Sequence, residues 1–135
     1  MKTYYQANRN LNYDLRSVPY SPPSNLYVGL STTPIFADGT GITEPSSSMG
    51  YARVPVATNT TNWSVASNGT LSNNVDITFP EATNDWGTVT YVFLADAQNN
   101  SGGNVLYYEA LVKSRIVQQN ATLIFKAGAL KFIDG

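Results

Sequence analysis

The sequence contains neither cysteine nor histidine among its 135 residues. Without thiols the chain can form no disulfide, no thiolate nucleophile and no zinc–thiolate site. Without imidazole it lacks the commonest general base and the commonest metal ligand, which excludes a Ser-His-Asp triad and a histidine-metal site. These absences predict a protein that is not an enzyme and that holds no metal and no cofactor.

Charge is scarce as well, because only 13% of the residues are charged. Eight Lys and Arg stand against nine Asp and Glu, which gives a net charge of −1. Such a chain has no long-range attraction to nucleic acid or to anionic lipid, so we expect neither as a partner. The polar surface consists mainly of Asn, Thr and Ser, and this favours extensive contacts with other proteins.

Long apolar runs are also missing. No stretch approaches the roughly 18 apolar residues that span a membrane. The first ten residues, MKTYYQANRN, lack the apolar core of a signal peptide. We therefore expect synthesis in the cytoplasm and no membrane contact.

What the sequence does contain is a series of short strand-like stretches, which recur at about ten-residue spacing and are separated by polar turns. No long helical pattern falls between them. This predicts an all-β fold, an antiparallel β-sandwich, jelly roll or small barrel of about seven to nine short strands. The expected strands cover residues 26–31, 51–57, 61–66, 74–79, 88–95, 104–112, 115–118, 122–127 and 129–134.

The N-terminal segment has a different pattern. Tyr4, Leu11, Leu15 and Val18 follow one another at helical spacing, although the many Asn residues weaken the tendency to form a helix. The proline-rich PYSPPSN then ends any helix. We expect residues 1–20 to form a short amphipathic helix or an ordered arm, and residues 21–135 to form a single β-sandwich domain.

Residues 79–96, FPEATNDWGTVTYVFLAD, combine three acidic residues with a strongly apolar run. Glu81, Asp85 and Asp96 could act as the paired carboxylates of a glycosidase if about 5–9 Å separated them across a sugar. The alternative is a corner that feeds a strand into the core, because Asn84-Asp85 has turn chemistry and Asp96 ends the apolar run. We favour the corner.

In that interpretation this stretch anchors the fold. A large indole packs at the corner, a glycine gives backbone freedom before the strand, and the strand's apolar side chains enter the core. The predicted structural anchors are Pro80, Trp86, Gly87, Tyr91 and Phe93.

Three regions are candidate interfaces with other proteins. Residues 1–20 form an arm that orders on assembly, residues 32–50 form a loop too long for an ordinary connection, and the strand at 51–57 carries a proline typical of a sheet edge. The alternatives are a solvated tail, a mobile loop and a protected edge. The candidate interface residues are Tyr4, Tyr5, Leu11, Leu15, Ile35, Phe36 and Pro55.

Seven motifs occur in the order found in a known family. They are YSPPSNLYVGLSTT, DGTGITEP, GYARVPV, NWSVASNG, ITFPEATNDWGTVTYVFLAD, GGNVLYYEAL and FKAGALKF. Together they resemble, over residues 20–133, a family of small virion proteins of tailed bacteriophages that are often labelled tail-fibre-like. The resemblance implies a structural component of the virion, made in the host cytoplasm, without catalytic residues.

Several positions on the particle fit that resemblance. We expect a capsid cement or decoration protein that binds the lattice of the major capsid protein, because the sequence shows neither the repeats nor the stalk pattern of a long fibre. A tail-fibre or baseplate-associated module is the alternative, with other virion proteins as partners. A glycan-binding adhesin that uses Trp63 or exposed tyrosines is a third hypothesis. A homo-oligomer, a dimer or a trimer, is expected from symmetry.

Overall fold

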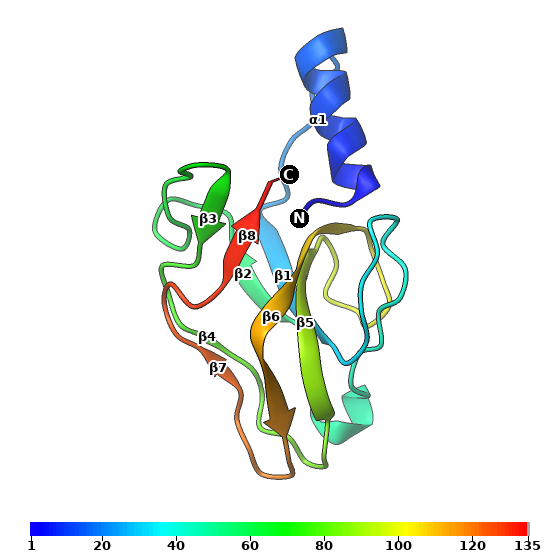
Figure 1. Cartoon of the computed structure of the whole chain (residues 1–135), viewed down its shortest axis with the longest axis vertical. Helices are drawn as coiled ribbons and strands as arrows, with labels where there is room; N and C mark the ends of the chain where they lie inside the picture. Colours follow the sequence, from blue (N-terminus) through cyan, green and yellow to red (C-terminus); the bar gives the residue numbers. More distant parts are fainter. Residues whose placement is uncertain (135) are drawn as a thin grey trace.

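A computed structural model describes residues 1–134 and shows a mostly β chain with one helix at its N-terminus (Figure 1). This confirms the prediction of an antiparallel β protein with a short N-terminal helix. Residue 135, the last of the predicted β domain, lies outside the described residues. The elements are α1 (Tyr4–Arg16), β1 (Asn25–Ser31), a 3₁₀ turn (Ser47–Met49), β2 (Val54–Ala57), β3 (Thr70–Ser72), β4 (Ile77–Thr78), β5 (Gly87–Ala95), β6 (Val105–Val117), β7 (Ile124–Phe125) and β8 (Lys131–Ile133).

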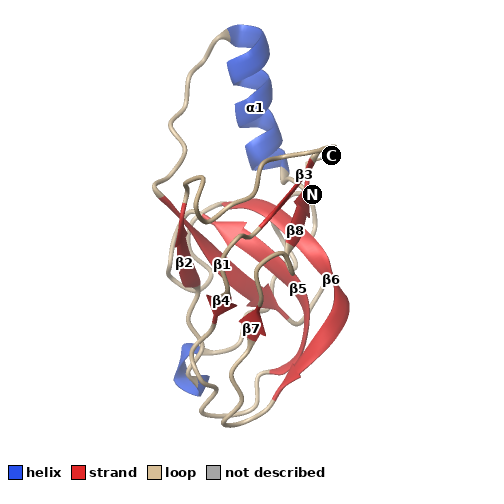
Figure 2. Cartoon of the chain, turned by 90° about the vertical axis from the view of Figure 1, so that its left-hand side faces the viewer, coloured by secondary structure: helices blue, strands red, loops and turns tan. Residues whose placement is uncertain are grey.

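Hydrogen bonding divides the strands of residues 1–134 into three antiparallel sheets. One sheet has the order β2-β1-β5-β6, while β3 pairs with β8 and β4 pairs with β7. The two short ladders pack with the larger sheet around a shared core (Figure 2). The finer prediction of a sandwich or jelly roll, which implies two larger sheets, is not confirmed by this pairing.

The core is centred on β5, whose Val, Thr, Tyr and Phe residues have high β propensity. Val92 and Leu94 face the main core, together with residues of β1, β4, β7 and β8. Phe93 and Ala95 face the opposite side and form a smaller core with Ile35 and Tyr108. Since β5 is buried on both faces, it reads as a nearly continuous apolar run.

Phe93 also explains the glycine in β1. A Cβ added at Gly29 would lie 2.2 Å from the Phe93 ring, so only a residue without a side chain lets this ring lie against β1.

Strand β6 unites two stretches that the sequence predicts as separate strands, 104–112 and 115–118. Their separation survives as a bulge, since the register passes from Val89↔Arg115 to Tyr91↔Ala110. Two steps along β5 therefore correspond to five steps along β6. Among the extra residues of β6, Leu111 packs against the main core whereas Val112 is fully exposed.

The predicted strand at 61–66 is not formed as such. Its backbone makes a single isolated bridge, between Trp63 and Asn73, within a turn-rich segment. Among residues 1–134, no helix is both long and apolar enough to span a membrane.

Candidate functional site

The acidic residues of the 79–96 stretch do not meet. Asp85 precedes the nine-residue strand β5 and Asp96 follows it, which places them roughly 30 Å apart at about 3.3 Å per residue. Each caps a turn: Asp85 accepts a hydrogen bond from the Gln119 amide at 2.8 Å, and Asp96 accepts one from the Asn104 amide at 2.6 Å. Across residues 1–134, no three Asp or Glu gather as metal ligands would.

Trp86 lies at a corner, buried to 4% exposure. Its indole N–H donates to the Met49 carbonyl at 2.8 Å, and its ring meets the Tyr51 ring edge-on at 5.4 Å. Gly87 follows with a φ of +86°, a conformation that favours glycine. Of the other predicted anchors, Phe93 is fully buried, Tyr91 is half-buried and Pro80 is exposed.

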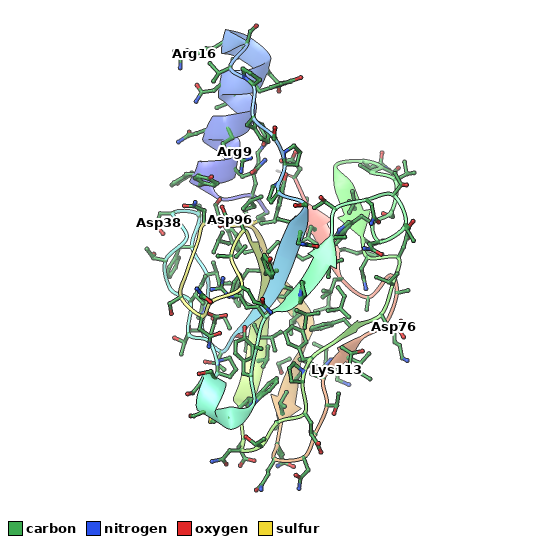
Figure 3. The ribbon with its side chains drawn as sticks, turned by 180° about the vertical axis from the view of Figure 1, so that it is seen from behind. Arg9, Arg16, Asp38, Asp76, Asp96 and Lys113 are labelled. Atoms are coloured by element: carbon green, nitrogen blue, oxygen red, sulfur yellow. The ribbon has the colours of Figure 1, made fainter. Side chains whose placement is uncertain are left out.

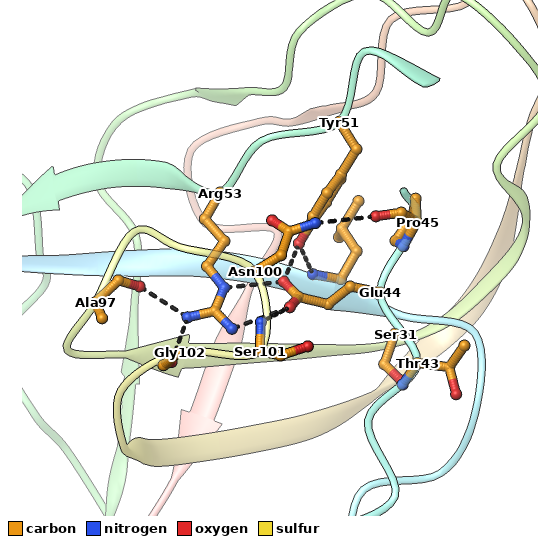
Figure 4. Close-up of polar contacts among 11 residues, drawn as sticks. Ser31, Thr43, Glu44, Pro45, Tyr51, Arg53, Ala97, Asn100, Ser101 and Gly102 are labelled. Carbon is orange, nitrogen blue, oxygen red and sulfur yellow. Dashed lines mark hydrogen bonds and ion pairs between the residues drawn. The ribbon is translucent and has the colours of Figure 1, made fainter. Parts of the chain in front are cut away.

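A buried ion pair joins the loops on one side of the sheet (Figure 4). Arg53 Nε and Nη2 donate to the two Glu44 carboxylate oxygens at 2.9 and 3.0 Å, and the two side chains are only 2% and 4% exposed. Arg53 Nη1 donates to the carbonyls of Ala97 and Gly102 at 2.7 and 3.0 Å. Its guanidinium group also lies 5.0 Å from the Phe93 ring centroid. This ion pair therefore connects the 32–50 loop, β2 and the β5–β6 turn.

Glu44 accepts two further hydrogen bonds, from the Tyr51 hydroxyl at 2.7 Å and the Ser101 amide at 2.8 Å. Burial acts to raise the pKa of Glu44, but the hydrogen bonds from Arg53, Tyr51 and Ser101 outweigh it and lower the pKa below its usual value. Burial, followed by the Glu44 charge, raises the pKa of the Tyr51 hydroxyl. The sequence pattern does not predict this cluster, and its one signal is a pair of opposite charges in a chain with few charged residues.

The cluster fixes the 32–50 loop, one of the candidate interface regions. Ile35 is buried beside Phe93, so its side chain does not reach the surface that the interface prediction requires. Phe36 is exposed. Pro55 is exposed on β2, which is the edge strand of the large sheet as its proline indicates.

Helix α1 forms despite its Asn content because both of its ends are capped and the segment that follows it packs along one side. Thr3 caps the N-terminus by accepting from the Gln6 amide at 3.3 Å, and the Val18 amide donates to the Asn12 carbonyl beyond the last turn. The following segment returns along the helix, so that Arg9 lies 4.1 Å from the Tyr20 ring centroid.

The start of α1 is fixed to the body of the molecule. The Thr3 amide donates to the Leu106 carbonyl, and the Tyr108 amide donates to the Met1 carbonyl, both at 2.9 Å, so residues 1–3 cover part of the outer edge of β6. Beyond its first turn the helix stands clear of the strands (Figure 2). Figure 3 shows Arg16 at the far end and Arg9 nearer the body.

The free side of α1 carries an apolar stripe, defined here as Tyr4, Leu11 and Leu15, and Val18 lies beyond the end of the helix at Arg16. These side chains are 63%, 55%, 78% and 45% exposed. Tyr5, another predicted interface residue, is less exposed and lies near Arg9. An exposed stripe of this kind on a capped helix indicates an interaction surface.

An apolar cleft of about 500 Å³ opens beside the foot of α1. Leu94 and Phe132 are buried in its wall, and Trp63 meets Phe132 edge-on at 6.3 Å. Lys2 connects the foot of the helix to this cleft, because it bridges to Tyr107 and forms an ion pair with Asp134 at 2.8 Å. The residues that line the cleft include Leu26, Trp63, Ala66, Leu71, Tyr107 and Phe132.

Several polar groups at the rim of the cleft are engaged within the chain, whereas the indole N–H of Trp63 in its wall has no hydrogen-bond partner. Asn59 Oδ1 accepts from the amides of Thr61 and Asn62, and Ser64 Oγ accepts from the Ser72 amide at 2.9 Å. The Thr58 hydroxyl donates to the Pro23 carbonyl at 2.7 Å.

A family model described as Podophage GP4 fiber I protein gp80 matches residues 1–133. No curated protein matches the chain. The family match confirms the resemblance drawn from the seven motifs and supports a structural component of a phage virion. The chain belongs to the podophage GP4 fiber I protein gp80 family.

Proposed function

We propose that the chain is a non-enzymatic module of a phage fibre, in which residues 1–20 form the attachment arm and the remaining residues form a rigid body. The observation that carries the proposal is the apolar stripe on α1, because it is presented on a capped helix clear of the strands. The rest of the chain supports a passive role: its carboxylates cap turns, and its best-formed polar cluster binds loops together.

The description of the matching family supports a position in the fibre. The matching family is described by a fibre protein, which favours the fibre over the capsid. The capsid cement role, with the major capsid protein as partner, is the alternative, and the match does not confirm it. For either position, the arm would contact another virion protein by inserting apolar side chains.

The test is incorporation into particles. Phage carrying Leu11→Gln with Leu15→Gln should assemble with fewer copies of the chain, because these exposed side chains do not contribute to its core. Val112→Gln, on the β6 bulge, is the matched control for replacing an exposed apolar residue. Incorporation of the double variant at the wild-type level would contradict attachment through α1.

Copy number on purified wild-type particles distinguishes the two positions. A fibre module should be present in a number set by the tail's symmetry, whereas a decoration protein should follow the number of capsid subunits. Quantitative mass spectrometry against the major capsid protein measures this ratio.

A further inference from the structure

We propose that the outer edge of β6, over residues 110–116, binds an extended acidic segment of another virion protein as an added strand. This goes beyond the proposed function, because it assigns a second interaction surface in which α1 takes no part. Two separate observations support it. The edge is open to further main-chain hydrogen bonds, and two cations beside it form no ion pair within residues 1–134.

Strand β6 lies at the end of the large sheet, and Figure 2 shows it at one side of the molecule. Its inner edge pairs with β5, whereas its outer edge forms one bridge, between Tyr107 and Lys2. Within residues 1–134, no strand or bridge pairs with the outer edge beyond Tyr108. An edge strand with unpaired N–H and C=O groups is a template for a strand from another chain.

Residues 1–3 already use the first part of this edge. The Thr3 amide donates to the Leu106 carbonyl, and the Tyr108 amide donates to the Met1 carbonyl, both at 2.9 Å. With the antiparallel bridge, these bonds make residues 1–3 a short added strand. A partner segment that continues their line pairs with residues 110–116, so the proposed interface extends one that the chain itself forms.

The β6 bulge leaves the middle of this edge without partners on its inner side as well. Residues 111–114 have no opposite residue in β5, because the register passes from Ala110 to Arg115. Lys113 and Ser114 are exposed there. A bulge with an exposed lysine opposes indiscriminate pairing with apolar strands, so this edge selects a partner of complementary charge.

The charge beside this edge is of one sign. Residues 110–133 contain no acidic residue and four cations, which are Lys113, Arg115, Lys126 and Lys131. Lys126 pairs with Asp76 at 3.3 Å. Lys113 and Arg115 form no ion pair within residues 1–134. This local excess of positive charge attracts an acidic partner, although the net charge of the whole chain is −1.

The spacing of the two unpaired cations favours a peptide strand over other anions. Lys113 and Arg115 are two residues apart, and alternate residues of a strand face the same side. The Arg115 guanidinium group also lies 5.3 Å from the Phe125 ring centroid, which limits its movement. A paired strand with acidic residues at alternate positions places a carboxylate opposite each cation. An anionic polysaccharide would meet the cations but leave the open edge unpaired.

The first experiment uses a fluorescein-labelled peptide in which glutamate and threonine alternate over about eight residues, a common strand length. Fluorescence anisotropy should show saturable binding to the purified full chain, whereas the same peptide with lysine in place of glutamate should not bind. Lys113→Glu should raise the dissociation constant at least about tenfold, because it places like charges opposite each other. Lys113 is exposed, so this variant should fold normally.

Two variants serve as matched controls. Arg16→Glu makes the same change of net charge at the far end of α1, and it should bind the peptide like the wild type. Val112→Gln lies on the β6 bulge without a change of charge and should also bind normally, since the added strand pairs through the main chain. If Arg16→Glu weakens binding as much as Lys113→Glu does, the attraction is nonspecific and the edge is not the site.

Two N-methylated peptides test the strand pairing itself. In an added strand, alternate residues direct their amides toward the neighbouring strand. Methylating the amides of the glutamates in one peptide and of the threonines in the other should therefore abolish binding in one case and preserve it in the other. Equal binding of the two peptides would contradict strand pairing, and equal binding at the unmodified level would indicate a general anion site, which an acidic polysaccharide also fits.

The β6 edge and the α1 stripe are decided separately. Failure of the wild-type chain to bind the acidic peptide would overturn the added strand and leave attachment through α1 untouched. The chain with Leu11→Gln and Leu15→Gln should bind the peptide normally, because both substitutions lie on the helix. Loss of that variant from particles therefore reports on α1 alone.

Discussion

At the scale of single residues, the Glu44–Arg53 ion pair is the most consequential contact in the chain. Glu44→Gln should destabilise the fold by about 3–5 kcal/mol, because it leaves the Arg53 charge buried without a partner. Chemical denaturation at neutral pH measures the loss. Asp76→Asn is the matched control: it removes a carboxylate from an exposed pair, and its stability should stay close to that of the wild type.

The Glu44 carboxylate also makes the free energy of unfolding depend on pH, in a direction that its lowered pKa determines. The folded pKa of Glu44 lies below the ordinary value of 4.5, so the stability it contributes is present above pH 4.5 and is lost as pH falls through the folded pKa. The difference in unfolding free energy between the wild type and Glu44→Gln should therefore narrow in acid. A difference that stays constant from pH 7 to pH 3 would show that the ion pair does not carry this dependence.

Trp86 gives a second prediction at this scale. Trp86→Ala should cost about 3–5 kcal/mol because it leaves a cavity at the corner. Trp86→Phe keeps the ring and loses only the N–H donor to Met49, so it should cost about 1–3 kcal/mol. Thermal unfolding that ranks the alanine variant equal to the wild type would place the indole outside the core.

At the scale of elements, residues 1–18 contain two parts. Residues 1–3 hydrogen-bond to the outer edge of β6, and helix α1 extends away from the strands. Deleting residues 1–18 should leave the strands folded by circular dichroism, since the main core contains none of these residues. It also removes the backbone cover over the outer edge of β6, and an uncovered edge promotes aggregation at high concentration. Loss of the β spectrum on deletion would instead make the arm part of the core.

The elements also show what a sequence can predict here. The helix, β1, β2 and β5 follow from local periodicity, β propensity and proline placement, so they were predictable. The joining of 104–112 with 115–118 into β6 depends on pairing with β5, which no local pattern contains. The cleft could not be predicted either, because Leu26, Trp63, Tyr107 and Phe132 are brought together only by the arrangement of the sheets.

The whole molecule combines a rigid β body with an apolar arm, so binding of the arm should change the thermal stability of the chain. A virion protein that binds the α1 stripe should stabilise the folded chain, so the midpoint of thermal unfolding should be higher for the chain bound in the particle than for the free chain. Leu11→Gln with Leu15→Gln should remove this increase, while the midpoint of the free variant should match that of the free wild type. Equal midpoints for the bound and the free wild-type chain would contradict attachment through α1.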